Sequence, residues 1–372
     1  MSEVSIRAAA ESPYTRHPPQ SLSTHAVLAD AARRTLRDAG LEPGDIDGLG
    51  VSSFTLRPDR GIDLAVRLGL ELGWLMDAGT GGASAVDMLQ HAVRAIEAGD
   101  ARNVLLVAGD VFHDDDFRAL VDEYNRATRD HLAPIPFGGP NSLFALLTRR
   151  HMEAHGIGRE DYGALVVAQR RWASSNPGAA YREPLSIEEY LAAPLVSEPL
   201  GRYDCVPVVA GGDAVVVSGE GGAGVRVRAL GVRHNADRHD GDGLATGLAT
   251  LADGLWEAAG TGPDEIDVVS VYDDYPAVAL IQLADLGFGE PRSVLGAVAD
   301  RELPVNTSGG QLSAGQAGAA GGMHGLVEVV EQLRRRAGER QVEGARLGVV
   351  TGYGMVAYRY GACAGAVVLE AP

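Results

Sequence analysis

Two short segments carry side chains that could donate or accept protons: tyrosines in both, and carboxylates in the first. The first, VYDDYP at 271–276, supplies Tyr272, Asp273, Asp274 and Tyr275. In an extended strand alternate side chains share a face, so Tyr272 and Asp274 are expected on one side and the other two on the opposite side. A carboxylate or a phenol in a pocket can act as a general acid or base. For any single tyrosine, core packing with a satisfied hydroxyl is the simpler explanation.

The second segment, TGYGMVAYRYG at 351–361, contains three further tyrosines. Glycines flank Tyr353 on both sides and leave its ring room to lie on the floor of a pocket. Tyr358 follows in the same segment. A phenol has a reference pKa of about 10, so acting as a base requires a lowered pKa or an adjacent base, whereas donating a proton or a hydrogen bond does not. We therefore predict Tyr353 and Tyr275 as the leading catalytic groups, with Asp274 as the alternative base.

A glycine-rich stretch, VNTSGGQLSAGQAGAAGG at 305–322, precedes an amphipathic helix. Glycine allows positive φ and close approach of the backbone to a ligand or to another element. A packing junction between a helix and a strand would use glycine in the same way. Gln316 lies in the middle of the stretch. Its amide cannot shuttle a proton near neutral pH, but it can donate a hydrogen bond to a carbonyl oxygen.

The composition excludes several kinds of catalyst. The chain has 372 residues and 32 basic residues, all of them arginine. Without lysine there is no Schiff base, no P-loop lysine and no lysine general base. The acidic clusters VFHDDDF and HNADRHDGDG match no standard metal-ligand spacing, so we expect no metal site.

Charge and cysteine content limit the possible partners and compartments. The formal net charge is −18, which argues against a nucleic-acid or anionic-membrane partner. No apolar run reaches the roughly 18 residues of a membrane span, and the N-terminus does not resemble a signal peptide. The two cysteines do not make a disulfide framework, and a cytoplasmic location is expected.

An internal repeat divides the chain into two parts. LRDAGLEPGDIDGLGV at 36–51 matches WEAAGTGPDEIDVVSV at 256–271, and each copy reads as a helix ending at glycine, a turn containing proline, and an apolar strand. The Gly-rich helix start at 80–99 and the strand after it have a counterpart at 313–354. We predict two α/β halves, 1–227 and 228–372, related by a pseudo-twofold axis. Residues from about 118 to 200 have no counterpart and are expected to form a lid inserted in the first half.

Taken together, these motifs resemble the thiolases, especially the sterol-carrier-protein or lipid-transfer type. NTSGGQLSAGQAGAAGG is similar to that family's NxxGGxxAxGHPxGxxG signature, and VVSVYDDYP occupies the position of its HDCF or NEAF motif. The resemblance covers nearly the whole chain and implies a five-layered thiolase fold. It also implies that Asn306, Gly309 and Gly310 belong to the substrate pocket.

The resemblance also shows which catalytic groups this chain lacks. The family's nucleophilic cysteine falls on Gly82, its GHP histidine on Gln316, and its second cysteine on Gly352. Thr80 and Ser84 are the nearest possible replacements for the nucleophile, but no base accompanies them, and helix capping explains them better. His324 could line the pocket, but helix packing explains it better. We expect substrate contacts from Gln316, Gly82, Ser84, Asn306, Gly309, Gly310, His324 and Gly352, and catalysis from Tyr353, Tyr275, Tyr272, Asp274 and Tyr358.

A group of thiolase relatives without the cysteine carries GQAG in place of GHP, as this chain does. The resemblance to them implies retro-aldol cleavage, or its reverse, of a β-hydroxyacyl-CoA, with coenzyme A as part of the substrate and no other cofactor. It implies a homodimer formed through strands of the first half, possibly capped into a heterotetramer by a small OB-fold and zinc-ribbon protein. A non-catalytic acyl-CoA-binding subunit and a divergent acyltransferase using Ser84 remain alternatives.

Overall fold

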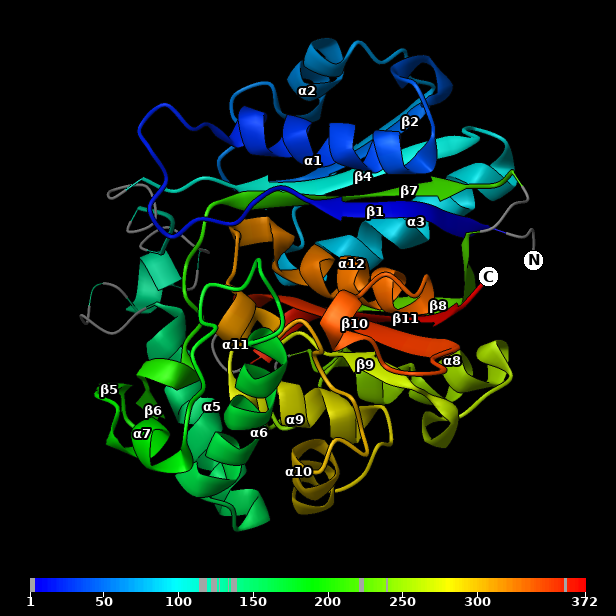
Figure 1. The fold of residues 1–372 in the computed structure, drawn as a ribbon. Helices are drawn as coiled ribbons and strands as arrows, with labels where there is room; N and C mark the ends of the chain where they lie inside the picture. Colours follow the sequence, from blue (N-terminus) through cyan, green and yellow to red (C-terminus); the bar gives the residue numbers. More distant parts are fainter. Residues whose placement is uncertain are drawn as a thin grey trace.

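The molecule is built in layers of sheets and helices (Figure 1). The computed structural model describes residues 4–113, 119–121, 126, 128–132, 134, 139–220, 224–238, 240–357 and 360–372. Within these ranges nine strands are hydrogen-bonded in the order β3-β2-β4-β7-β1-β8-β11-β10-β9. Their bounds are β1 Ser5–Glu11, β2 Gly48–Ser52, β3 Trp74–Asp77, β4 Asn103–Asp110, β7 Gly211–Ser218, β8 Val225–His234, β9 Val268–Ser270, β10 Leu347–Ala357 and β11 Tyr360–Glu370.

The two predicted copies of the repeat form equivalent elements. Helix α1 (Thr24–Ala39) and helix α8 (Ala252–Ala259) both end at a glycine with left-handed backbone, Gly40 at φ 66° and Gly260 at φ 63°. In each copy a 3-10 turn that begins with proline follows, and then a strand, β2 or β9. Glycine carries no penalty for positive φ, which is why each helix stops there. The first part reads β2-β4-β7-β1 and the second β9-β10-β11-β8 across the sheet, in agreement with a pseudo-twofold relation.

Helices α3 (Ser84–Ala98) and α12 (Gly321–Leu333) form the layer between the two sets of strands (Figure 1). The 3-10 turns Gly81–Ala83 and Gly318–Ala320 lead into them and lie in contact with each other. Helices α1 and α2 (Arg60–Leu68) cover the outer side of the first set of strands. Helices α8 and α9 (Pro276–Asp285) cover the second. The five layers predicted from the family resemblance are therefore present.

The predicted insertion contains helices α5 (Pro140–His155), α6 (Arg159–Ala173) and α7 (Ile187–Ala192), and strand β5 (Leu195–Ser197). Strand β5 pairs with β6 (Leu200–Gly201). Helices α5 and α6 contact α9, and α6 also contacts α10 (Pro291–Ala299) and α11 (Gly310–Ala314). The insertion thus packs against helices of the second part. The predicted boundary at 227/228 stays a prediction, since β8 runs across it without a break.

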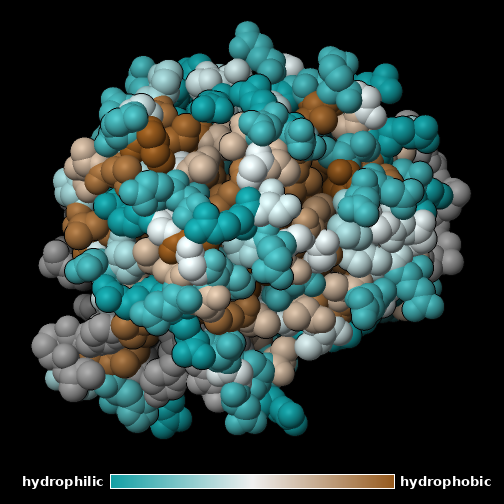
Figure 2. Space-filling model, turned by 90° about the horizontal axis from the view of Figure 1, so that it is seen from below, coloured by the Kyte–Doolittle hydropathy of each residue, from teal (hydrophilic) through white to brown (hydrophobic). Residues whose placement is uncertain are grey.

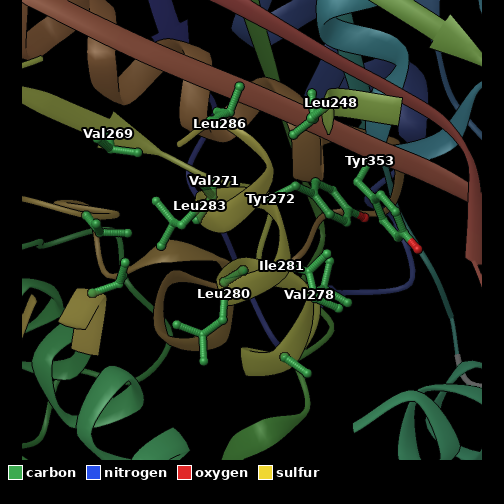
Figure 3. Packing of buried hydrophobic residues seen from close by; sticks show 14 of the residues in the cluster. Leu248, Val269, Val271, Tyr272, Val278, Leu280, Ile281, Leu283, Leu286 and Tyr353 are labelled. Carbon is green, nitrogen blue, oxygen red and sulfur yellow. The ribbon is translucent and has the colours of Figure 1, made fainter. Parts of the chain in front are cut away.

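The largest core cluster joins the insertion to the second part. It includes Phe144 of α5, Tyr272, Tyr353 and most of α9. Figure 3 shows side chains of α9, among them Val278 and Ile281, packed close to the rings of Tyr272 and Tyr353. Hydrophobic residues on the face seen in Figure 2 lie in separate areas among hydrophilic ones. In the part of the chain that the structure describes, no helix has the length and apolarity needed to cross a membrane.

Candidate active site

A cavity of about 450 Å³ lies where the insertion meets the two Gly-rich turns. Aromatic and aliphatic side chains make up much of its wall, among them Phe54, Phe112, Phe144, Val206, Val208 and Val356. The polar residues at its wall include Asn141, Tyr272, Asp274, Tyr275 and Gln316, and the backbone of Gly82 also lines it. A largely apolar hollow with a few convergent polar groups is typical of a small-molecule site.

The backbone around Tyr272 is held by buried polar contacts. The Tyr272 N–H donates to Thr351 Oγ1 at 3.0 Å, and Gln282 Nε2 donates to the Tyr272 carbonyl at 2.6 Å. The Thr351 hydroxyl in turn donates to Gln282 Oε1 at 2.6 Å. One residue earlier, the Val271 N–H donates to Asn306 Oδ1 at 2.9 Å. The segment after β9 is therefore fixed by partners from β10, α9 and the NTSGG motif.

The ring of Tyr272 lies against Gly82. A Cβ atom built on Gly82 would overlap the ring and hydroxyl of Tyr272, so no side chain fits at this position in the present arrangement. Gly322 packs equally closely against the backbone of Gly82, since a Cβ atom on Gly322 would overlap the Gly82 carbonyl. Glycine at both positions lets the two turns and the tyrosine meet. The need for this close approach explains why the sequence is rich in glycine around the start of α12.

Gln316, Tyr272 and Asp274 form a polar cluster at the cavity wall. Gln316 Nε2 lies 3.0 Å from the Tyr272 hydroxyl and 3.0 Å from Gln311 Oε1, and it also donates to Asp274 Oδ1. An amide nitrogen carries two hydrogens, so it serves only two of these three acceptors at once. The Tyr272 hydroxyl also donates to the Asp274 carboxyl. The sequence prediction that Tyr272 and Asp274 share one side agrees with this arrangement.

The carboxyl of Asp274 titrates near neutrality. Burial and the nearby charge of Asp273 raise its pKa, the hydrogen bonds from Tyr272 and Gln316 lower it, and the resulting pKa is about 7. A group with such a pKa can both accept and donate a proton at neutral pH, as general acid–base catalysis requires.

Asp273 points away from this cluster, into the N-terminus of α11. Its carboxyl accepts from the Gln311 N–H at 2.9 Å and from Gln169 Nε2 at 3.1 Å. Burial raises the pKa of Asp273 to about 7 as well. Gly310 leaves room for this carboxylate, since a Cβ atom there would overlap it. Asp273 therefore holds α11 in place and does not line the cavity.

The position of Tyr275 differs from the strand pattern. Alternation placed it on the side of Asp273, but it lines the same cavity as Asp274. The reason is that β9 ends at Ser270 and Tyr275 is already the N-cap residue of α9, so the period of two no longer applies. Its hydroxyl donates to Asn141 Oδ1 of α5 at 2.7 Å, and its ring stacks on Phe144 at 4.3 Å between centroids.

Tyr353 is buried beside Tyr272, with ring centroids 6.5 Å apart (Figure 3). Its hydroxyl accepts a hydrogen bond from the Gly361 N–H across the β10–β11 pair. Val356 of the same strand lines the cavity, whereas Tyr353 is not among the lining residues. Tyr358 lies outside the described residues.

Comparison with known proteins decides the family. The chain is 32% identical over 339 residues to 17-hydroxy-3-oxo-4-pregnene-20-carboxyl-CoA lyase of Mycobacterium tuberculosis, covering 83% of this chain and 86% of the relative. It is 30% identical over 350 residues to the steroid side-chain-cleaving aldolase of Thermomonospora curvata, covering 84% and 85%. The thiolase C-terminal domain-like family matches residues 229–365. A solved structure described as Ltp2-ChsH2(DUF35) aldolase superposes with a TM-score of 0.85 at 25% identity, covering 100% of this chain and 98% of that one.

This chain belongs to the thiolase superfamily.

Within this superfamily member, the positions where the resemblance implied catalytic cysteines offer no space for a new side chain. Gly82 faces Tyr272, as described above. A Cβ atom on Gly352 would lie 3.0 Å from the Ala83 Cα and 3.1 Å from the Gly82 carbonyl oxygen. Gly309 has a positive φ of 101°, and a Cβ atom there would overlap Ala173 of α6. Asn306, Gly309, Gly310 and Gly352, which the resemblance implied in the substrate pocket, are not among the residues that line the cavity.

Thr80 is the N-cap residue of the 3-10 turn Gly81–Ala83, and Ser84 is the first residue of α3. Neither residue's side chain makes a cap hydrogen bond to a backbone N–H. Their hydroxyls instead lie 3.2 Å from each other, and Thr80 donates to Asp87 Oδ2 at 3.0 Å. The nearby carboxylate competes successfully for the Thr80 hydroxyl. Ser84 is fully buried and is not among the residues that line the cavity.

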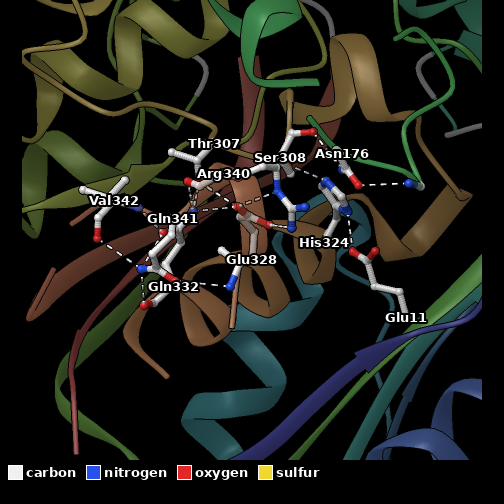
Figure 4. Close-up of polar contacts among 12 residues, drawn as sticks. Glu11, Asn176, Thr307, Ser308, His324, Glu328, Gln332, Arg340, Gln341 and Val342 are labelled. Carbon is white, nitrogen blue, oxygen red and sulfur yellow. Dashed lines mark hydrogen bonds and ion pairs between the residues drawn. The ribbon is translucent and has the colours of Figure 1, made fainter. Parts of the chain in front are cut away.

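His324 lies behind the cavity in a charged network (Figure 4). Its Nδ1 is 2.6 Å from Glu11 Oε1, and its Nε2 is 2.8 Å from Ser308 Oγ. Although burial lowers the pKa of His324, the Glu11 carboxylate outweighs it and the pKa rises to about 9. His324, Glu11 and Asp213 place ligand-type atoms within 4.8 Å of one another, a set that could hold a metal ion. With His324 protonated, its short contact with Glu11 is an ion pair, and a metal ion at this set would have to displace the His324 proton.

Sequence patterns missed two residues that shape the site. Asn141 comes from the insertion, which has no repeat or motif to mark it. Asp110, at the end of β4, accepts hydrogen bonds from the Phe54 N–H and the Ala319 N–H, each at 2.8 Å. It thereby joins a cavity residue of the first part to the Gly-rich turn of the second. The sequence signal that could have marked Asp110 is its place as an aspartate at the end of an apolar, buried strand.

Proposed function

We propose that this protein is a carbon–carbon lyase that cleaves a β-hydroxyacyl-CoA by a retro-aldol reaction, without a covalent enzyme intermediate. The contact between Asp274 and Tyr272 carries the proposal. It places a carboxyl with a pKa of about 7 and a phenol at the wall of an apolar cavity, where a thiolase would hold its nucleophile. Two relatives whose names describe a CoA lyase and a side-chain-cleaving aldolase support the same reaction class.

The reaction balances without any cofactor. Ionised Asp274 takes the proton of the substrate's β-hydroxyl, directly or through the Tyr272 hydroxyl. The Cα–Cβ bond then breaks, the β-carbon becomes a carbonyl, and the electron pair passes to Cα and the thioester oxygen as an enolate. The Gln316 amide donates one N–H to that oxygen in place of one of its present acceptors. Asp274 returns the proton to Cα, which yields a shortened acyl-CoA and a ketone or aldehyde.

The other two interpretations fit the geometry less well. An acyltransferase needs an accessible nucleophile, but Ser84 is buried and bonded to Thr80. Cys205 lines the cavity, but burial raises the pKa of its thiol to about 12, which leaves it protonated. A non-catalytic acyl-CoA-binding subunit would not need a carboxyl with a pKa near neutrality at the cavity wall.

We infer three further properties. The acyl group is bulky and apolar, in keeping with the cavity wall and the steroid names of the relatives. The protein forms a homodimer and pairs with a small partner of the DUF35 type named in the related aldolase structure, where the sequence resemblance implied an OB-fold and zinc-ribbon protein. It works in the cytoplasm, since both cysteines are free thiols.

The direct test is product analysis. Purified protein, alone and with the DUF35-type partner, is incubated with a β-hydroxyacyl-CoA that has a branched apolar acyl group. Equal amounts of shortened acyl-CoA and of the carbonyl product, with the protein mass unchanged, are expected. Unchanged substrate in both samples would favour the non-catalytic subunit, and a stable acyl adduct would favour acyl transfer.

A further inference from the structure

A second recess of about 400 Å³ opens beside the cavity. The two hollows share Phe112 and Val208 in their walls. The loop after β1 supplies Arg16 and His17 to the recess, and the segment after β4 supplies His113. A ligand that extended along this common wall would have one end beside Asp274 and the other beside Arg16.

The described wall of the recess carries one positive charge and two histidines, in a chain whose net charge is −18. It contains Arg16, His17 and His113 and no carboxylate. Arg16 takes part in none of the ion pairs found among the described residues. Its guanidinium instead lies over the Tyr181 ring, 5.1 Å from the centroid. An exposed arginine held by an aromatic face keeps its planar donors ready for an anion.

A buried arginine, Arg170, lies over the same tyrosine as Arg16. Arg170 lies over the same Tyr181 ring at 4.9 Å and is only 4% exposed. Its Nε donates to Ser313 Oγ at 3.0 Å, but its Nη2 has no hydrogen-bond partner and no carboxylate pairs with it in the described part of the chain. A buried guanidinium usually has a carboxylate partner. Arg170 is not among the residues that line the recess, but it adds a second positive charge around the Tyr181 ring that holds Arg16.

We propose that this recess binds the phosphate-bearing nucleotide end of the CoA thioester, with Arg16 as its main contact and His17 and His113 beside it. The inference rests on the proposed function, because it supplies the carrier end of the same substrate. It also selects CoA over a carrier protein. A carrier-bound thioester presents a single phosphodiester and no nucleotide, and would leave most of a 400 Å³ recess unused.

Binding measurements separate the parts of the carrier. Isothermal titration of the complete protein with CoA, dephospho-CoA and pantetheine tests the recess without requiring turnover. CoA should bind at least about tenfold more tightly than pantetheine, since charge-assisted hydrogen bonds to phosphate are lost with the nucleotide. The affinity for CoA should also fall as salt is raised. Equal affinity for CoA and pantetheine would overturn the proposal. Tight binding of a carrier-protein thioester together with weak binding of CoA would point to the other source.

Arg16→Gln is the decisive variant. Arg16 is exposed, so the change removes the charge with little risk to folding. It should weaken CoA binding by about tenfold and leave pantetheine binding unchanged. Arg33→Gln is the matched control, because Arg33 is exposed on α1 away from the recess, and it should bind CoA as the wild type does. Unchanged CoA affinity in Arg16→Gln would overturn the assignment.

The two proposals can fail independently. If the protein binds CoA through Arg16 but cleaves no β-hydroxyacyl-CoA, the recess assignment stands and the proposed reaction fails. If it cleaves the thioester while Arg16→Gln leaves both CoA affinity and KM unchanged, the reaction stands and the recess assignment fails.

Discussion

The ring of Tyr272 occupies the space that a side chain at Gly82 would need. The family resemblance implied the thiolase nucleophile at Gly82, and Tyr272 comes from the opposite part of the molecule. The same phenol contacts Gln316 and Asp274. Under the proposed function, the catalytic group expected at Gly82 and the phenol that replaces it therefore meet at a single contact.

Gly82→Ala should destabilise the protein through this contact. The added methyl group overlaps the Tyr272 ring, and overpacking of this kind costs about 1–3 kcal/mol. Chemical denaturation of Gly82→Ala, Tyr272→Leu and the double variant should show that the second change relieves much of the first. Gly79→Ala is the control, because a Cβ atom there meets nothing within 4 Å. Strictly additive effects would mean that the two residues do not meet.

Asp274→Asn should alter the pH dependence of stability. The folded pKa of about 7 lies above the ordinary value of 3.8, so its contribution to the free energy of unfolding is full below about pH 4 and is lost as pH rises through about 7. The asparagine variant lacks this loss, so its melting temperature relative to wild type should increase from pH 5 to pH 8. Asp273, whose pKa is also raised to about 7, still titrates in both proteins. A melting-temperature difference independent of pH would contradict the raised pKa.

Tyr272→Phe and Tyr353→Phe should act on different properties. Tyr272 contacts Asp274 at the cavity wall, so loss of its hydroxyl should lower kcat by roughly a hundredfold, within the range of general acid–base groups. The Tyr353 hydroxyl accepts a hydrogen bond from the Gly361 N–H, so Tyr353→Phe should lose about 1 kcal/mol of stability and retain most of its turnover. This reverses the order expected from sequence. A large loss of turnover in Tyr353→Phe with normal stability would restore the original order.

The fold could be predicted from sequence further than the site could. Helix ends at Gly40 and Gly260 and the strands after them repeat in a pattern that local chemistry dictates. The cavity instead depends on contacts between distant segments. The alternation expected of a strand predicted the wrong side for Tyr275, because no local sequence signal marks the end of β9 at Ser270. The contact of Asn141 with Tyr275, and the exclusion of Tyr353 from the cavity wall, follow from packing of the insertion and cannot be read from either segment alone.

The proposed homodimer has a specific candidate surface. Strand β3 is at the end of the nine-strand order, and among the described residues it pairs with β2 alone; its Leu75 is 40% exposed. Beside it, Ile62 and Val66 of α2 are 54% and 74% exposed. An open strand edge with apolar neighbours suits a twofold contact between copies. Val66→Asp should shift the mass measured by light scattering from dimer towards monomer, and Leu146→Asp on α5 is the control. A wild-type monomer at micromolar concentration would contradict the dimer.

The pH dependence of kcat/KM for cleavage of a β-hydroxyacyl-CoA tests the central claim most directly. If ionised Asp274 is the base, kcat/KM of the wild type should rise about tenfold per pH unit at acidic pH and level off above about 7. Asp274→Asn should be slower by roughly a hundredfold or more and should lose that rise. A wild-type profile that is flat through pH 7, or an Asp274→Asn variant that retains the wild-type rate, would contradict the account.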